Sequence, residues 1–216
     1  MLLFVAVTLD ARSVADVVAQ YGPSAHRRMD RYFRSARVAY PPHEVALLVF
    51  KREERVSLWA RSAPDAQWRF VRRYDMTANS GRLGPKLREG DLQIPEGIYR
   101  IEHLNPNSSY HLSMKVSYPN EFDRRMAARD RRTRLGGDIF IHGKAVSIGC
   151  VAVGDRAIEE LFTLVAETGR SRARVIIAPN DLRARGAIVH DEAPPWVGQL
   201  YRTIGAALRD FPLTME

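Results

Sequence analysis

The chain has 216 residues and carries 33 Lys and Arg against 25 Asp and Glu, a formal net charge of +8 with His neutral. Hydrophobic residues make up 45% and charged residues 27% of the sequence, which excludes a collagen-like, low-complexity or wholly disordered chain. The longest apolar runs, such as Val45 to Phe50, are far shorter than the roughly 20 residues that cross a bilayer, so we expect no transmembrane segment. The basic charge favours an anionic partner, and nucleic acid, a membrane surface and an acidic cell-wall polymer all fit it.

The first part of the chain is predicted to be helical. Residues 1–9 are apolar but carry no Lys or Arg ahead of the apolar run, which makes them a poor secretory signal. Apolar residues recur at helical spacing between Ala11 and Ala39, and Gly22-Pro23 is expected to break the helix in two. We therefore predict that residues 1–43 form an α-helical N-terminal extension packed on the main domain.

A region rich in short strands follows. Its first two strands flank a charged turn at residues 51–54, a pattern typical of a hairpin. Short strands with turns between them argue against a parallel βαβ architecture and favour a mainly β fold of the sandwich or barrel kind, with a few packed helices. The strands are expected at residues 45–50, 56–60, 68–74, 98–101 and 111–118.

The remainder of the chain is predicted to add helices. Residues 121–134 hold six Arg against three acids and are expected to form a solvated helix or loop, or else the basic lip of a cleft. A helix capped by Asp155 and ended by Gly169 precedes a strand at residues 175–178, and a terminal helix follows Pro194. We assign residues 44–180 to the main domain and residues 181–216 to a C-terminal tail and helix.

The chemistry is expected in residues 137–150, where a strand ends in His142-Gly143 and a loop leads to Cys150, the single cysteine. Cysteine attacks as a thiolate, and its ordinary pKa of about 8.5 leaves little thiolate at neutral pH, so a nearby His is the usual proton acceptor. The backbone amides of Gly149 and Cys150, with that of Ile148, are candidates for stabilising an oxyanion. The alternatives are a hydrogen-bonded core His142 and a buried, unreactive Cys150.

A metal site is the weaker interpretation of these residues. A zinc site would need His142, Cys150 and Asp155 with His103 or His111, and this set has no standard ligand spacing. We therefore predict no metal and no cofactor.

Two motifs carry a resemblance to a known family. Ile141-His142-Gly143 followed by Ser147-Ile148-Gly149-Cys150 resembles the active-site signature of L,D-transpeptidase catalytic domains, and residues 94–99, with Pro95-Glu96-Gly97, are similar to the start of a strand in that family. The resemblance covers residues 44–180 and is greatest to the short-loop, murein-transpeptidase-like branch. The chain departs from the signature at Ile148, where the family commonly has His.

The resemblance implies roles for particular residues. Cys150 would be the nucleophile and His142 the base that activates it, oriented through the carbonyl of Gly143. Support of the loop and of the oxyanion hole would come from Gly143, Ser147, Ile148 and Gly149. Candidate substrate contacts are Tyr118, Asn120 and His111.

The resemblance also implies acyl transfer on peptidoglycan stem peptides through a thioester, in the cell envelope or periplasm. An amine acceptor would make the protein a transpeptidase, an envelope protein being one such acceptor, and water would make it a carboxypeptidase or endopeptidase. We expect a monomer and no nucleic-acid partner. The alternative is a non-catalytic basic module that binds an anionic polymer such as cell wall or nucleic acid.

Overall fold

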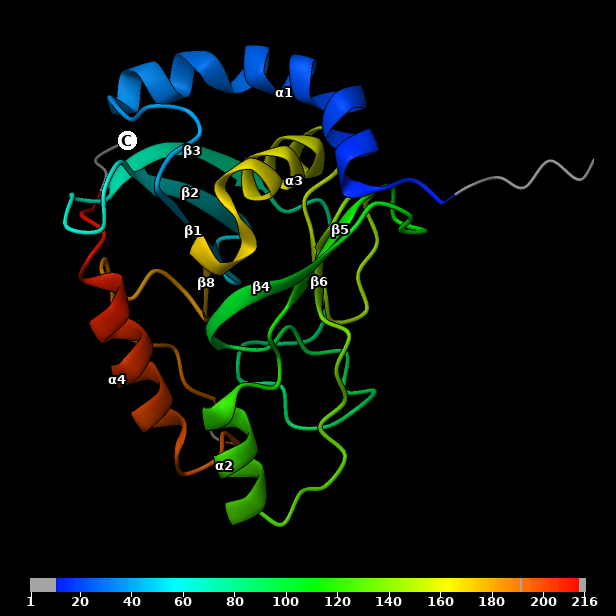
Figure 1. Ribbon diagram of the computed structural model, residues 1–216. Helices are drawn as coiled ribbons and strands as arrows, with labels where there is room; N and C mark the ends of the chain where they lie inside the picture. The colour runs from blue at the N-terminus through cyan, green and yellow to red at the C-terminus, as the bar shows by residue number, and fades with distance from the viewer. Residues whose placement is uncertain (1–10, 191, 214–216) are drawn as a thin grey trace, which may run out of the picture.

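The computed structural model describes residues 11–190 and 192–213, so the prediction for residues 1–9 lies outside the described residues. Eight strands form one sheet in the order β3-β2-β1-β8-β4-β5-β6-β7. The strands are β1 (Glu44–Phe50), β2 (Arg55–Arg61), β3 (Arg69–Asp75), β4 (Gly97–Asn105), β5 (Ser113–Val116), β6 (Phe140–His142), β7 (Val151–Ala152) and β8 (Ala173–Ala178). The helices are α1 (Val14–Ala36), α2 (Glu121–Arg129), α3 (Asp155–Thr168) and α4 (Val197–Leu208) (Figure 1), with a short 3-10 helix, η1 (Arg170–Arg172).

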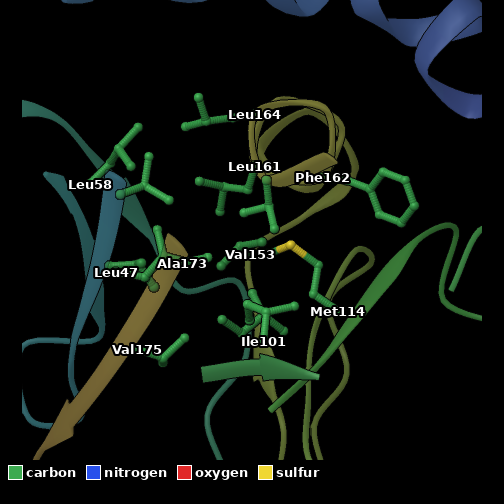
Figure 2. Packing of buried hydrophobic residues seen from close by; sticks show 14 of the residues in the cluster. Leu47, Leu58, Ile101, Met114, Val153, Leu161, Phe162, Leu164, Ala173 and Val175 are labelled. Carbon is green, nitrogen blue, oxygen red and sulfur yellow. The ribbon is translucent and has the colours of Figure 1, made fainter. Parts of the chain in front are cut away.

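The sheet separates two hydrophobic cores. Alternate residues of the apolar run in β1 point to opposite faces: Val45, Leu47 and Val49 join a core under α1 and α3, whereas Ala46, Leu48 and Phe50 join a core with α4. Figure 2 shows the first core, in which Leu161 and Leu164 of α3 lie over Leu47 and Leu58 of the sheet. Burial on both faces explains why β1 is apolar at nearly every position.

The mainly β fold is confirmed, and the hairpin of β1 and β2 lies at the expected residues. Two pairs of neighbouring strands are nevertheless parallel, since β1 pairs in parallel with β8 and β6 in parallel with β7. The strand β8 lies between β1 and β4, which places the most apolar strands at the middle of the sheet. The sheet curls at β4, where the register with β5 shifts between Ile101 and His103.

Helix α1 is continuous, so the predicted break at Gly22-Pro23 was wrong. A capping box between Ser13 and Asp16 begins the helix, and Pro23 lies inside it. A Pro inside a helix costs about 3 kcal/mol. Burial of Met29 and Phe33 beyond the Pro gains roughly 1.5–3 kcal/mol for each side chain, which offsets that cost. The helix covers α3 and the first strands of the sheet (Figure 1).

No helix among the residues that the structure describes is long and apolar enough to span a membrane.

Candidate active site

The parallel pairing of β6 and β7 brings the two motif residues to neighbouring strands. Ile141 pairs with Val151 and His142 with Ala152, so His142 ends β6 and Cys150 immediately precedes β7. Parallel neighbours usually need a connection of about a dozen residues or more. Here residues 143–150 alone make the connection, and this segment is called the catalytic loop below.

Unusual backbone conformations and tight packing make so short a loop possible. Lys144 and Gly149 have positive φ angles of 58° and 121°. At Gly149 a Cβ would also lie 3.3 Å from the carbonyl oxygen of Gln93, so Gly suits this position on two grounds. At Gly143 a Cβ would lie 2.6 Å from Oδ1 of Asp155, which leaves no room for a side chain.

Asp155 holds the start of the loop rather than capping α3, so its predicted N-cap role was wrong. The N-cap residue is Gly154, and Asp155 is the first residue of α3. Its Oδ1 accepts a hydrogen bond from the backbone N–H of Lys144 at 2.8 Å. The Asp155 carboxylate therefore accepts from the loop amide of Lys144, and not from an amide of α3 as predicted. It still lies at the N-terminus of α3, the positive end of the helix dipole.

Ser147 supports the end of the loop. Its hydroxyl donates to the carbonyl oxygen of Cys150 at 2.7 Å and lies 2.9 Å from the hydroxyl of Ser80. The backbone N–H of Gly149 reaches the Ser147 hydroxyl only at 3.4 Å, a long hydrogen bond. Ile148 is 72% exposed, so its side chain lies in solvent.

His142 is buried and held in one tautomer. A carbonyl oxygen can only accept, so the 2.6 Å contact of Nδ1 with the carbonyl oxygen of Gly143 is an Nδ1–H donation. The neutral ring then carries its lone pair on Nε2, the nitrogen that can accept a proton. Burial lowers the pKa of His142, and the Gly143 hydrogen bond only partly opposes this. The ring of Tyr110 lies against the imidazole, with centroids 4.6 Å apart.

Cys150 is half-buried, and its Sγ lies 3.7 Å from the carbonyl oxygen of Asp138. Burial raises the pKa of the Cys150 thiol, and the hydrogen bond from the Phe140 backbone and the charge of Lys86 only partly counteract it. With the pKa of His142 lowered and that of Cys150 raised, the resting pair at neutral pH is a neutral imidazole and a neutral thiol.

One cleft of about 430 Å³ contains both residues. Its walls come from residues 86–92, from residues 136–140 and from the catalytic loop. Apolar side chains of 38% to 72% exposure lie along it, namely Leu92, Tyr110, Val146 and Ile148. The thiol is therefore in a cleft that a ligand can enter, and not sealed in a core.

The three candidate substrate residues are not among those that line this cleft, and each has a partner elsewhere. Tyr118 is buried, with its hydroxyl 3.2 Å from the carbonyl oxygen of Leu135. Asn120 is the N-cap of α2. His111 places Nε2 3.1 Å from Oε1 of Glu159.

Sequence reasoning missed Lys86 and Tyr110. Lys86 lines the cleft although it is almost fully buried, and its Nζ donates to Oδ1 of Asp91 at 2.6 Å. Asp91 lies only five residues after Lys86, but no pattern in the sequence indicates that the two side chains pair. Among the described residues, no group of His, Cys, Asp and Glu is arranged to hold a metal ion.

The geometry agrees with comparisons to known proteins. The model of the YkuD family, described as an L,D-transpeptidase catalytic domain, matches residues 45–177. The chain belongs to this family. A curated relative, "Putative L,D-transpeptidase YafK" of Escherichia coli strain K12, is 33% identical over 140 residues, which are 62% of this chain and 54% of the relative. The chain thus spans about half the length of the curated relatives it matches.

Solved structures support the fold. The helical cell shape determining protein Pgp2 of Campylobacter jejuni superposes with a TM-score of 0.52 at 21% identity, covering 64% of this chain and 48% of that chain. Its K307A mutant gives the same TM-score at 19% identity, covering 73% of this chain and 56% of that chain.

Proposed function

We propose that this chain transfers acyl groups on peptidoglycan stem peptides through a thioester on Cys150, with His142 as the general base. The observation that carries the proposal is the imidazole at the cleft of Cys150, with its Nδ1–H donated to Gly143 and its Nε2 left as the basic nitrogen. A general base needs a free lone pair, and this tautomer leaves one on Nε2.

In the first half-reaction, His142 Nε2 takes the thiol proton and Sγ attacks the carbonyl carbon on the L-centre of a diamino acid. The C–S bond forms, the C–N bond to the terminal D-amino acid breaks, and the imidazolium returns its proton to the leaving amine. An amine or water then attacks the thioester and releases the thiol. Backbone N–H groups of Gly149 and Cys150, with that of Ile148, are the proposed oxyanion donors.

The neutral resting pair sets the order of these events. Because burial disfavours both charged forms, the proton leaves the thiol as the substrate carbonyl is attacked rather than beforehand. Gly143 orients the base, while Ser147 and Gly149 shape the end of the loop. Ile148 contributes its backbone N–H, while its exposed side chain lies along the cleft.

The remaining parts of the proposal concern the setting of the reaction. We assign catalysis to residues 44–180, with residues 1–43 and 181–216 as an extension and a tail whose helices α1 and α4 cover the two faces of the sheet. The protein would act as a monomer in the cell envelope or periplasm, where stem peptides lie. The acceptor is an amine, which includes an envelope protein, or water.

Two measurements test the proposal. After incubation with a carbapenem, the intact mass of the protein should increase by one acyl adduct, and Cys150→Ala protein should gain none. Stem tetrapeptides incubated with the protein should lose their terminal D-amino acid. When an amine acceptor is added, product should form that carries this amine in place of the D-amino acid. An equal adduct on Cys150→Ala, or unchanged stem peptides with the wild-type protein, would favour the non-catalytic basic module.

A further inference from the structure

A second cavity, of about 820 Å³, also borders the catalytic loop. It lies between α1, β3 and the first turn of α3, and we call it the basic pocket. Its lining carries six cationic side chains against two acidic ones, a formal excess of four positive charges. The cations are Arg27, Arg28, Arg31, Arg72, Lys144 and Arg156.

Two of the arginines share a single buried carboxylate. Oε1 of Glu160 accepts from Nε of Arg28 at 2.6 Å, and Oε2 accepts from an Nη of Arg72 at 2.6 Å. The hydroxyl of Tyr74 also donates to Oε2, at 2.9 Å. Arg28 also donates to Oε2 of Glu159 at 3.0 Å, so two carboxylates hold these two guanidinium groups and balance their charge.

Aromatic stacking on Tyr32 holds a third arginine, Arg31, near Arg72. The guanidinium of Arg72 lies 4.3 Å from the ring centroid of Tyr32, and that of Arg31 lies 4.6 Å from the same centroid. When a guanidinium stacks on the face of an aromatic ring, its N–H groups point outward in the guanidinium plane and can still donate to other acceptors. These guanidinium groups are thus positioned before any ligand arrives, which lowers the entropy lost on binding.

Further positive charge in the pocket has no internal counter-charge. Among the residues that the structure describes, Arg27 and Arg156 form no ion pair with a carboxylate. The first turn of α3, residues 154–157, also forms part of the lining, and its N-cap Gly154 provides no side chain to cap the helix amides. Helix amides and guanidinium groups both favour an oxyanion.

We propose that the basic pocket binds a phosphate-bearing ligand with at least two negative charges. Its donors come from three elements, α1, β3 and α3, so they approach from directions that are not coplanar. A tetrahedral phosphate presents oxygens in several directions, whereas a carboxylate presents two in one plane. The volume exceeds that of one phosphate group. Among the described residues, four of the lining cations form no ion pair with a carboxylate, which favours a ligand with more than one negative charge.

The test uses the full chain carrying Cys150→Ala, so that binding is measured apart from the proposed thioester chemistry. Titration calorimetry with inorganic pyrophosphate at low salt should show one site, and raising the salt to about 0.5 M should weaken binding about tenfold or more. The double variant Arg27→Ala and Arg156→Ala should weaken binding about tenfold or more, because each removes one exposed, unpaired cation that attracts the ligand. The matched control is Arg129→Ala in α2, which removes one exposed positive charge outside the pocket and should leave binding unchanged.

The melting temperature of each variant without ligand checks that the fold is intact. No heat of binding with pyrophosphate would overturn the proposal, and so would equal weakening by Arg129→Ala and by the double variant. Malonate is the carboxylate arm of the experiment. If it binds as tightly as pyrophosphate, the assignment to phosphate is wrong.

Discussion

The catalytic loop borders two cavities whose charges are managed in opposite ways. In the cleft of Cys150, titratable groups are desolvated with little compensation, so both the thiol and the imidazole favour their neutral forms. In the basic pocket, the side chains of Arg28 and Arg72 are 21% exposed and share the buried Glu160. A guanidinium is not deprotonated in proteins, and here water and the carboxylate offset the cost of its partial burial. Partial solvation together with an ionic partner preserves charge, whereas burial without a counter-charge suppresses it.

Together, the two proposals assign two kinds of chemistry to the cavities on either side of one loop. A neutral pair in an apolar cleft suits a proton transfer that occurs during attack on a carbonyl. A set of fixed cations suits reversible binding of an anion. Each of the following experiments either disrupts one of the two cavities or measures a property in which they differ.

The largest expected effect follows His142→Ala. Loss of the general base should lower kcat for stem-peptide cleavage by about 10²- to 10⁴-fold. The control is Tyr110→Phe, which keeps the ring against the imidazole and should leave kcat close to the wild-type value. If His142→Ala protein kept the wild-type kcat, His142 would not be the general base, and the contrast between the cleft of Cys150 and the basic pocket would no longer hold.

Glu160→Ala tests whether ion pairing with Glu160 holds the arginines of the basic pocket. It leaves Arg28 and Arg72 without their shared carboxylate, and removing one partner of a buried ion pair costs about 3–5 kcal/mol. We expect the lower end of that range, because both arginines are partly exposed and can reach water. Urea denaturation measures the free energy of unfolding.

Glu121→Ala provides the comparison for that experiment. It breaks an exposed pair with Arg125 on α2 and should cost only about 0.5 kcal/mol. Equal costs for the two variants would show that Glu160 does not hold the basic pocket together.

Gly143→Ala addresses the residue that orients the base. The added Cβ would lie 2.6 Å from Oδ1 of Asp155 and 2.8 Å from the carbonyl oxygen of Tyr110, so the start of the loop must shift. Overpacking of this kind costs about 1–3 kcal/mol, and kcat should fall with the displaced imidazole. Outside the cleft, Gly186→Ala meets open space and should change neither quantity. Similar behaviour of the two variants would contradict the tight packing at Gly143.

The smallest effect is the pH dependence of the thiol. Because the pKa of Cys150 is raised in the folded state, its alkylation by iodoacetamide should reach half-maximal rate at a higher pH than in urea-unfolded protein. The unfolded thiol ionises first as the pH rises, so the folded state loses stability above the unfolded thiol pKa. In Cys150→Ala protein, the contribution of the thiol to this loss of stability should be absent. A midpoint below that of the unfolded chain would instead indicate a preformed thiolate.

Much of the fold followed from patterns within the chain. The hairpin of β1 and β2 was predictable because two apolar runs flank a charged turn, and α4 because its apolar residues recur at helical spacing. The continuity of α1 through Pro23 was not predictable, because it depends on burial against α3, more than a hundred residues away in the chain. Asp155 was misassigned for a similar reason, since a neighbouring loop took its carboxylate.

The sequence by itself determined the strand and loop that carry His142 and Cys150, because these residues lie within one short segment whose glycines and hydrophobic residues set its local structure. Only the tertiary structure decided that Lys86 and Tyr110 line the cleft, that β8 pairs in parallel with β1, and that arginines of α1, β3 and α3 surround one cavity. Local conformation depends on neighbouring residues, whereas the partner of a buried charge depends on how distant segments pack.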